Sequence, residues 1–280
     1  MTKKYLITGG AGFIGSNYVA RLLRRGDEVT IYDNLTRRGS RLNLSWLKSL
    51  NKSSFTLIEA DIRDFGRICQ AVEDVDVIVH LAGQVAVTTS VINPREDFGT
   101  NAEGTFNVLE AARNSQKNPI ILYSSTNKVY GAMDEIEVVE NEQNYRYKEL
   151  PFGISEKFPL DFHSPYGCSK GCGDQYVRDY HRIYGLPTVV LRQSCIYGPR
   201  QFGVEDQGWL AWFIIAVLTG KRISIYGNGK QVRDVLYIDD LLDAYDACVD
   251  HIEVSAGKIY NLGGGPDQMI SVWKEFSPIL

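Results

Sequence analysis

The fold of this chain is decided by residues 4–33, which read KYLITGGAGFIGSNYVARLLRRGDEVTIYD. Apolar runs over residues 4–8 and 28–32 predict two strands, and glycines crowd the turn that follows the first. The stretch between them predicts a helix that ends at Arg24-Arg25-Gly26, where cations meet the negative end of the helix dipole and glycine stops the helix. One face of this helix is apolar, with Ile14, Tyr18, Val19, Leu22 and Leu23. Residues 4–33 therefore predict a strand–helix–strand unit with a glycine-rich first turn.

The glycine-rich turn contains the pattern G-x-G-x-x-G at Gly10, Gly12 and Gly15. Glycines there let the backbone pass close beneath a pyrophosphate, whose charge is held by free N–H groups at the helix N-terminus. Asp33 ends the second strand, where its carboxylate can accept hydrogen bonds from both adenosine ribose hydroxyls and repel a 2′-phosphate. We therefore expect NAD in preference to NADP. Two observations remain open: Arg37 and Arg38 lie close enough to pair with a phosphate, and Asp33 could simply cap a turn.

Further short apolar runs alternate with helical patterns at residues 55–59, 75–81, 120–124 and 188–192. This alternation predicts an α/β fold with a Rossmann-type, doubly wound parallel sheet. Residues 132–163 are rich in charges and aromatics without a clear period, which predicts a long excursion over the surface.

Residues 201–230 predict a Trp-rich helix and a short strand at 223–226, before the chain returns to the sheet at 258–262. We expect an NAD-binding unit of residues 1–194 plus about 232–265. A smaller substrate-binding lobe of about 195–231 plus 266–280 is expected to be incomplete at its C-terminal end.

The composition excludes several classes of protein. With 44% hydrophobic and 23% charged residues the chain is neither disordered nor a membrane protein, and its longest apolar run, residues 210–218, is too short to span a bilayer. A net charge of −4 offers no broad basic surface for nucleic acid. The start lacks the pattern of a signal peptide, and the 5 cysteines lack a Cys-x-x-Cys, so we expect reduced thiols, no metal site and a cytoplasmic location.

Residues 164–170 read SPYGCSK and predict a helix start, with Ser164 as N-cap and Pro165 in the first turn. Tyr166 and Lys170 then share one helix face, where the ammonium and the helix dipole would lower the pKa of the tyrosine from its usual value of about 10. Such a tyrosine can remove or return a hydroxyl proton while hydride moves to or from nicotinamide. The alternative is a solvated pair on an ordinary helix.

A cluster of hydroxyls, Ser124-Ser125-Thr126, directly follows the strand expected at 120–124. It therefore lies at the carboxyl edge of the sheet, where ligands bind in folds of this type. These hydroxyls could orient a substrate alcohol, although serine and threonine also simply terminate strands.

These motifs together resemble the extended short-chain dehydrogenase/reductases that act on nucleotide sugars. The resemblance covers essentially the whole chain and rests on residues 8–15, Asp33-Asn34-Leu35, Asp61-Ile62, His80-Leu81-Ala82-Gly83, Tyr166-x-x-x-Lys170, Tyr197-Gly198-Pro199 and Arg233-Asp234-Val235. Within this group, residues 125–131, 161–170 and 206–209 look like the epimerases that act at C2 of CDP-linked sugars. Related dehydratases need an Asp-Glu pair after the catalytic threonine, where this chain has Asn127 and Lys128, so dehydration is not expected.

The resemblance implies roles for individual residues. It implies that Thr126 is a catalytic hydroxyl, Tyr166 the base and Lys170 its partner, and that Arg233 binds the substrate's diphosphate. The implied cofactor-binding residues are Gly9, Gly12, Phe13, Ile14, Gly15, Asp33, Asn34, Arg38, Asp61, Ile62, Leu81, Ala82, Gln84, Asn101, Ser124, Tyr166, Lys170 and Gln193. The candidate substrate-binding residues are Thr126, Cys195, Gln201, Gln207, Trp209, Gln231 and Arg233. Trp209 and Trp212 fit an apolar core equally well.

The expected function is NAD-dependent epimerisation of a nucleotide sugar, with a CDP-sugar favoured, through a transient keto intermediate. A UDP-hexose 4-epimerase would use the same catalytic residues. A non-catalytic NAD-binding protein is a third possibility, because relatives continue beyond the position of Leu280. The resemblance also implies a homo-oligomer, a dimer or tetramer. The helix over 166–184 is the candidate interface, although its stripe of Cys172, Tyr176, Tyr180 and Ile183 fits an internal core too.

Overall fold

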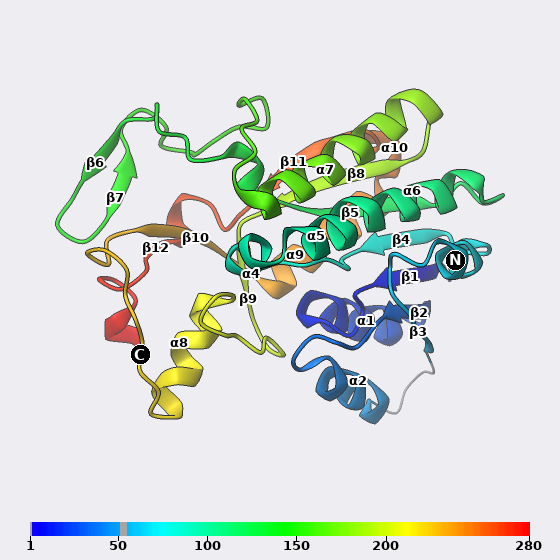
Figure 1. Cartoon of the computed structure of the whole chain (residues 1–280), viewed down its shortest axis with the longest axis horizontal. Coiled ribbons are helices and arrows are strands. Elements are labelled where there is room, and N and C mark those ends of the chain that lie inside the picture. Colours follow the sequence, from blue (N-terminus) through cyan, green and yellow to red (C-terminus); the bar gives the residue numbers. More distant parts are fainter. Residues whose placement is uncertain (1, 51–54) are drawn as a thin grey trace.

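A parallel sheet of seven strands forms the centre of the computed structural model, which describes residues 2–50 and 55–280 (Figure 1). The order across the sheet is β11 (Ile259–Leu262), β8 (Thr188–Gln193), β5 (Ile120–Thr126), β4 (Val77–His80), β1 (Lys4–Thr8), β2 (Glu28–Asp33) and β3 (Thr56–Glu59). The chain runs outward from β1 in one direction and then in the other, so the topological switch lies between β1 and β4. This confirms the expected Rossmann-type fold.

Helices cover both faces of the sheet and bury its apolar strands in two cores. One core contains side chains of α1 (Phe13–Arg25), α2 (Ser40–Ser49) and α9 (Ile238–Asp250). The opposite core contains side chains of α3 (Phe65–Val72), α6 (Gly104–Asn114) and α7 (Ser164–Tyr184). Strands β4 and β8 are buried at every position, as expected for parallel strands covered on both faces. Every strand therefore delivers its carboxyl end to one edge, framed by helices.

The first turn has the geometry that its glycines predict. Gly9 has a left-handed φ of 70°, and its N–H donates to the Tyr32 carbonyl at 2.8 Å. A Cβ on Gly15 would come within 2.4 Å of the Gly9 carbonyl oxygen, so no larger residue fits there. Helix α1 ends at Gly26, in a left-handed conformation with φ 89°, as predicted. The turn thus brings the N-terminus of α1 against the ends of β1 and β2.

Short helical segments connect the main elements. Near the carboxyl edge they are α4 (Val87–Ile92), α5 (Pro94–Phe98), a π-helical turn at Gly99–Glu103 and a 3₁₀ turn at Asn127–Tyr130, whereas α10 (Ile252–Ser255) precedes β11 at the opposite edge. Both α4 and α5 pack against α7. Among residues 2–50 and 55–280, no helix combines the length and apolar character that crossing a membrane requires.

A second sheet lies beyond the carboxyl edge of the first. It pairs β9 (Cys195–Tyr197) with β10 (Val232–Tyr237) in parallel, and β10 with β12 (Met269–Ser271) in antiparallel fashion. Strand β10, which we expected in the NAD-binding unit, therefore belongs to this second sheet, whereas α9 and β11 return to the main one. Turns at Pro266–Gln268 and Ser277–Ile279 flank β12 and the chain end.

Helix α8 (Trp209–Leu218) is the expected Trp-rich helix. Its Trp209 ring packs at 5.7 Å from Phe213 and at 5.2 Å from Phe276, so at least part of this tryptophan serves an aromatic core. The strand expected at 223–226 is wrong: these residues form no strand, and Tyr226 is 79% exposed. An alternating apolar pattern alone does not make a strand where no neighbour is available to pair with it.

The surface excursion at 132–163 is confirmed and carries a small hairpin, β6 (Val138–Glu140) with β7 (Tyr145–Tyr147). Figure 1 shows this hairpin projecting beside β10 and β12. Its backbone and side chains contact the second sheet: Tyr145 N–H donates to the Lys230 carbonyl at 3.2 Å, and Lys230 Nζ lies 2.8 Å from a Glu140 carboxylate oxygen.

Candidate active site

Helix α7 brings the predicted tyrosine and lysine to the end of β5. The helix begins at Ser164, one residue earlier than expected, yet the Ser164 Oγ accepts a hydrogen bond from Gly167 N–H at 3.3 Å as an N-cap does. Tyr166 lies in the first turn, and its backbone N–H donates to Ser90 Oγ of α4 at 3.1 Å. The start of α7 is therefore held both by its own serine and by the neighbouring helix.

Tyr166, Lys170 and Thr126 meet in a nearly closed site. Their side chains belong to residues that are 8%, 7% and 7% exposed. Thr126, the last residue of β5, lies close enough to Tyr166 for its side chain to lower the pKa of the phenol. The ammonium of Lys170 lies 4.3 Å from the centroid of the Tyr123 ring. A tyrosine and a threonine hydroxyl thus lie near each other at the carboxyl edge of the sheet.

Burial, and not the lysine, dominates the electrostatics of Tyr166. It raises the pKa of the phenol, and the nearby Thr126 side chain and the charge of Arg37 oppose this rise only in part. The prediction that Lys170 lowers the pKa of Tyr166 is therefore wrong for this structure. Burial also lowers the pKa of Lys170 to about 7, against the pull of the Asp174 and Asp97 carboxylates. Both groups are costly to ionise in the closed site.

A buried ion pair supports the strand end that carries Thr126. Arg192 of β8 donates to both carboxylate oxygens of Asp174 of α7, at 2.9 and 2.8 Å, and both side chains are almost wholly buried. Ser125 Oγ donates to the same carboxylate at 2.6 Å, while Arg192 also donates to Tyr130 OH at 2.8 Å. This network fixes residues 125 and 126 against α7.

The N-terminus of α1 is suited to hold a pyrophosphate. Its first-turn N–H groups have no intrahelical acceptor, its N-cap Gly12 offers no side chain, and its first turn has no acidic residue. A Cβ on Gly12 would meet only the Gly9 carbonyl oxygen, so the space above Gly12 is open to a ligand. The donors of Phe13 and Ile14 belong to this same first turn. These features fit the diphosphate of a dinucleotide.

Asp33 lies at the end of β2 and stabilises the glycine-rich turn by hydrogen bonding. Its two carboxylate oxygens accept hydrogen bonds from Ala11 N–H at 3.0 Å and Leu35 N–H at 2.8 Å. Burial raises the pKa of Asp33 although both hydrogen bonds favour the carboxylate. Each oxygen retains a second lone pair, so a capping role and a ribose-binding role are compatible.

The segment after β4 is positioned by buried hydroxyl and amide groups. Thr8 Oγ accepts from the backbone N–H groups of both Leu81 and Ala82 at 3.2 Å and contacts His80 Nδ1 at 2.7 Å. Burial lowers the pKa of His80 to about 3, so the imidazole is neutral and structural. Leu81 and Ala82 are thereby held so close to the glycine turn that a Cβ on Gly9 would clash with the Ala82 nitrogen at 2.8 Å.

Asn101 connects this segment to α7. Its side chain accepts from Gln84 N–H at 2.9 Å and donates to the Gln84 carbonyl at 3.1 Å and to Ser169 Oγ at 3.1 Å. The Gln84 side chain in turn contacts the backbone of Ala86. Asn101 and Gln84 therefore organise the wall of the site, with Asn101 only 1% exposed.

The remaining candidate cofactor residues occupy two places along the edge. Beyond the ends of β2 and β3, Asn34 donates a hydrogen bond to Asp61 at 3.3 Å. Arg63 lowers the pKa of Asp61 to about 2. The adjacent Ile62 is buried in the core. Beyond β5 and β8, Tyr245 OH accepts a hydrogen bond from Gln193 at 2.7 Å and lies near Ser124.

The candidate substrate residues lie in three places. Cys195 lies near Trp209 and near the cations of Arg233 and Lys128, and burial raises the pKa of its thiol. This group lies on the second-sheet side of Thr126. Gln231 is elsewhere, donating to the Tyr226 carbonyl at 2.5 Å.

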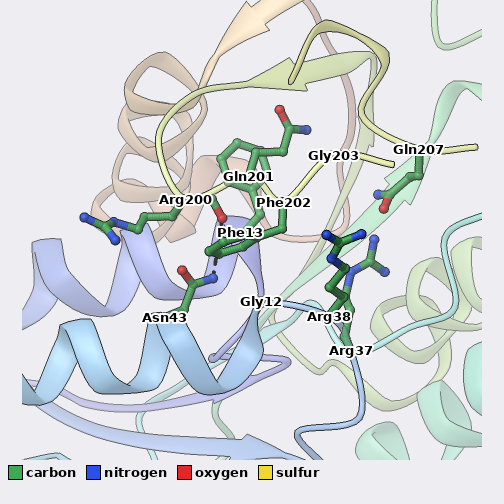
Figure 2. A pocket seen from close by; sticks show the side chains of 10 residues that line it. All are labelled: Gly12, Phe13, Arg37, Arg38, Asn43, Arg200, Gln201, Phe202, Gly203 and Gln207. Atoms are coloured by element: carbon green, nitrogen blue, oxygen red, sulfur yellow. Dashed lines mark hydrogen bonds between the residues drawn. The ribbon is translucent and has the colours of Figure 1, made fainter. Parts of the chain in front are cut away.

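Gln201 and Gln207 line a pocket at the glycine turn (Figure 2). The pocket is lined by Gly12, Phe13, Arg37, Arg38, Asn43, Arg200, Gln201, Phe202, Gly203 and Gln207. Figure 2 shows Gln201 and Phe202 above Phe13, and Arg37 and Arg38 reaching toward the loop that carries Gln207. These two glutamines, expected on the substrate side, thus lie next to residues expected to bind the cofactor.

Sequence reasoning missed several residues of the site. Asp97 is fully buried on α5, where it accepts hydrogen bonds from Ser169 and Asn101. Arg192 had a visible signal, an arginine inside the apolar run TVVLRQ, which requires a buried acid. Phe202 and Asp97 had no such signal in the sequence, because their partners are distant along the chain. Among the described residues, no group of three or more His, Cys, Asp or Glu could hold a metal ion.

Comparisons with known proteins agree with this geometry. Residues 5–263 match the model of the NAD dependent epimerase/dehydratase family. The chain is 46% identical over 268 residues to the CDP-paratose 2-epimerase of Salmonella typhi, covering 93% of this chain and 79% of that protein. It is 36% identical over 272 residues to the dTDP-glucose 4,6-dehydratase of Salmonella typhimurium strain LT2, covering 93% of this chain and 72% of that protein.

A solved structure shares the fold over nearly the whole chain. The UDP-glucuronic acid 4-epimerase of Bacillus cereus, in complex with UDP-glucuronic acid and NAD, is similar with a TM-score of 0.81 and 29% identity. The match covers 98% of this chain and 81% of that one.

Proposed function

The chain belongs to the NAD dependent epimerase/dehydratase family, and from this premise we propose that it epimerises a nucleotide sugar, converting CDP-paratose to CDP-tyvelose at C2. The observation that carries the reaction type is the contact of Tyr166 with Thr126 at the sheet edge, beside the N-terminus of α1. The choice of sugar and carbon is supported by the 46% identity to the Salmonella typhi enzyme.

Each catalytic side chain has a distinct task in this proposal. The Tyr166 phenolate removes the proton from the C2 hydroxyl, and Thr126 orients that hydroxyl by hydrogen bonding. NAD⁺, held by the first turn of α1 and by Asp33, would supply reversible hydride transfer at C2, so that the sugar passes through a ketone and the hydride can return on its opposite face. Tyr166 then gives the proton back to the alkoxide. The nearby Thr126 side chain and the charge of Arg37 favour this phenolate, and Lys170 adds an ammonium to the same buried site.

The substrate is held from the second-sheet side. Arg233 is exposed at the start of β10. Burial, and in addition the nearby charge of Arg233, lower the pKa of Lys128. We infer that they contact the diphosphate and the sugar, respectively, with Trp209 and Cys195 as neighbouring wall. Residues of the seven-stranded sheet would bind the cofactor, and those of the small lobe the substrate.

Two copies of the chain are proposed to associate through α6 and α7. The predicted stripe divides: Tyr180 is buried against α6 and donates to Glu110 at 2.7 Å, whereas Tyr176 and Ile183 are 47% and 65% exposed. Phe106 of α6 stacks edge-on against Tyr176 at 5.8 Å and is itself exposed. An exposed aromatic patch over two adjacent helices supports self-association.

Turnover of CDP-paratose in D₂O tests the reaction. Because the same hydride leaves and returns, the product is expected to carry no deuterium at C2, and the Tyr166→Phe variant to lose at least about 100-fold in kcat. Product analysis by mass spectrometry and NMR measures both. Deuterium at C2 would contradict the hydride route.

The neighbouring 4-epimerase supports the one alternative worth testing, a UDP-hexose 4-epimerase. Incubation with UDP-glucose, with CDP-paratose as the parallel reaction, separates the two: only the true substrate is expected to yield its epimer.

The role of Asp33 is tested by denaturing the purified protein and identifying the dinucleotide that is released. Release of NADP(H) would contradict that role.

A further inference from the structure

Residues 199–203, here called the strap, cross from the second lobe onto the first turn of the main sheet. Asn17 of α1 donates to the Pro199 carbonyl at 3.0 Å and to the Phe13 carbonyl at 2.9 Å. Asn43 of α2 donates to the Arg200 carbonyl at 3.5 Å and to the Ala11 carbonyl at 3.2 Å. The same two amides thus hold both the strap and the glycine turn.

Two side chains of the strap extend this attachment along α2. The Arg200 guanidinium lies 4.6 Å from the centroid of the Trp46 ring. Phe202 packs directly on Gly39, where a Cβ would come within 2.1 Å of the ring. Gly39 has a φ of 88°, so it supplies both a left-handed turn and the space that Phe202 fills.

The strap closes one side of the pocket at the N-terminus of α1 (Figure 2). On the opposite side lie Gly12, Phe13, Arg37 and Arg38. Two buried oxygens at this pocket, Asn43 Oδ1 and Gln201 Oε1, have no hydrogen-bond partner among the described residues. Leaving such atoms unsatisfied is costly, so a ligand with donors, such as ribose hydroxyls, fits this place.

We propose that the strap retains the bound dinucleotide, with Phe202 on Gly39 as the contact that must break before the cofactor leaves. The inference rests on the proposed function, in which one cofactor serves many turnovers and gains nothing by leaving. Release would require the strap to separate from Asn17, Asn43, Trp46 and Gly39 together. Contacts of this kind slow dissociation far more than they affect association.

The rate at which bound cofactor exchanges tests this proposal without any sugar substrate. The full chain is loaded with radiolabelled NAD⁺ and chased with excess unlabelled NAD⁺. Phe202→Ala is expected to release label at least about tenfold faster, equivalent to about 1.4 kcal/mol, and Phe202→Leu to stay close to the original rate. The matched control is Phe152→Ala, because Phe152 is 89% exposed on the distant excursion.

Each outcome decides the proposal. An unchanged release rate in Phe202→Ala overturns it. If that variant does not fold by circular dichroism, Arg200→Ala, which removes only the contact with Trp46, replaces it, and an unchanged rate there overturns the proposal equally. If the chain epimerises the sugar but all variants release the label at the same rate, the proposed role of the strap is refuted and the proposed function stands. A chain that binds no labelled NAD⁺ contradicts the proposed function as well.

Discussion

Lys170 is a buried cation whose ionisation costs the ligand-free protein stability. Burial lowers the pKa of its ammonium to about 7, below the value of about 10.4 in an unfolded chain. The penalty for burying the charge is therefore fully present below pH 7 and fades as the pH rises toward 10, where the group is neutral in both states. We predict that Lys170→Met raises the Tm of the dinucleotide-free protein at pH 6 by on the order of 5 °C, and by less at pH 9.

The same substitution is expected to reduce turnover at least about 100-fold, because the buried site that holds Tyr166 and Thr126 then loses its ammonium. Thermal melts across pH and steady-state assays measure the two effects. Lys48→Met on the exposed surface of α2 is the control and should move neither. A lower Tm for Lys170→Met at pH 6 would contradict the prediction, because it would show that the Asp174 and Asp97 carboxylates outweigh the cost of burying the ammonium.

Among the elements, α7 and β8 are joined by the Asp174–Arg192 pair beneath Thr126. With side chains 0% and 1% exposed, removing one partner leaves a charge that water cannot reach. We predict that Asp174→Asn lowers the free energy of unfolding by about 3–5 kcal/mol, because the Arg192 guanidinium remains buried without its counter-ion. Urea unfolding followed by circular dichroism measures the change.

The same helix offers a matched control for that measurement. Asp179 and Arg182 form an ion pair at 3.9 Å with side chains 57% and 50% exposed, so Asp179→Asn should cost less than about 1 kcal/mol. Equal losses for the two variants would mean that burial does not set the importance of the pair.

For the whole molecule, the exposed aromatic patch over α6 and α7 predicts a dimer. Ile183 is 65% exposed beside this patch, and a carboxylate there would have to be desolvated on association. We predict that Ile183→Glu converts a dimer to a monomer at micromolar concentration, as measured by sedimentation velocity.

Leu42 on α2 is 61% exposed on the opposite face of the main sheet, so Leu42→Glu should leave the mass unchanged. A monomeric parent chain, or a dimer that persists in Ile183→Glu, would refute the assignment of this interface.

The sequence by itself determined the features that depend on near neighbours. The strand–glycine turn–helix unit, the stop of α1 at Gly26 and the one-turn spacing of Tyr166 and Lys170 follow from local backbone preferences and helix periodicity. The alternation of strands and helices likewise determined a parallel sheet, because only crossover connections join such strands.

Only the tertiary structure decided which distant groups meet and how water is excluded around them. The tertiary fold turns Lys170 toward the Tyr123 ring, pairs Arg192 with Asp174 and seats Phe202 on Gly39, and it leaves residues 223–226 without a partner strand. Burial sets the pKa of Tyr166 against the expectation from its lysine, because desolvation depends on every surrounding segment and not on the spacing of two residues.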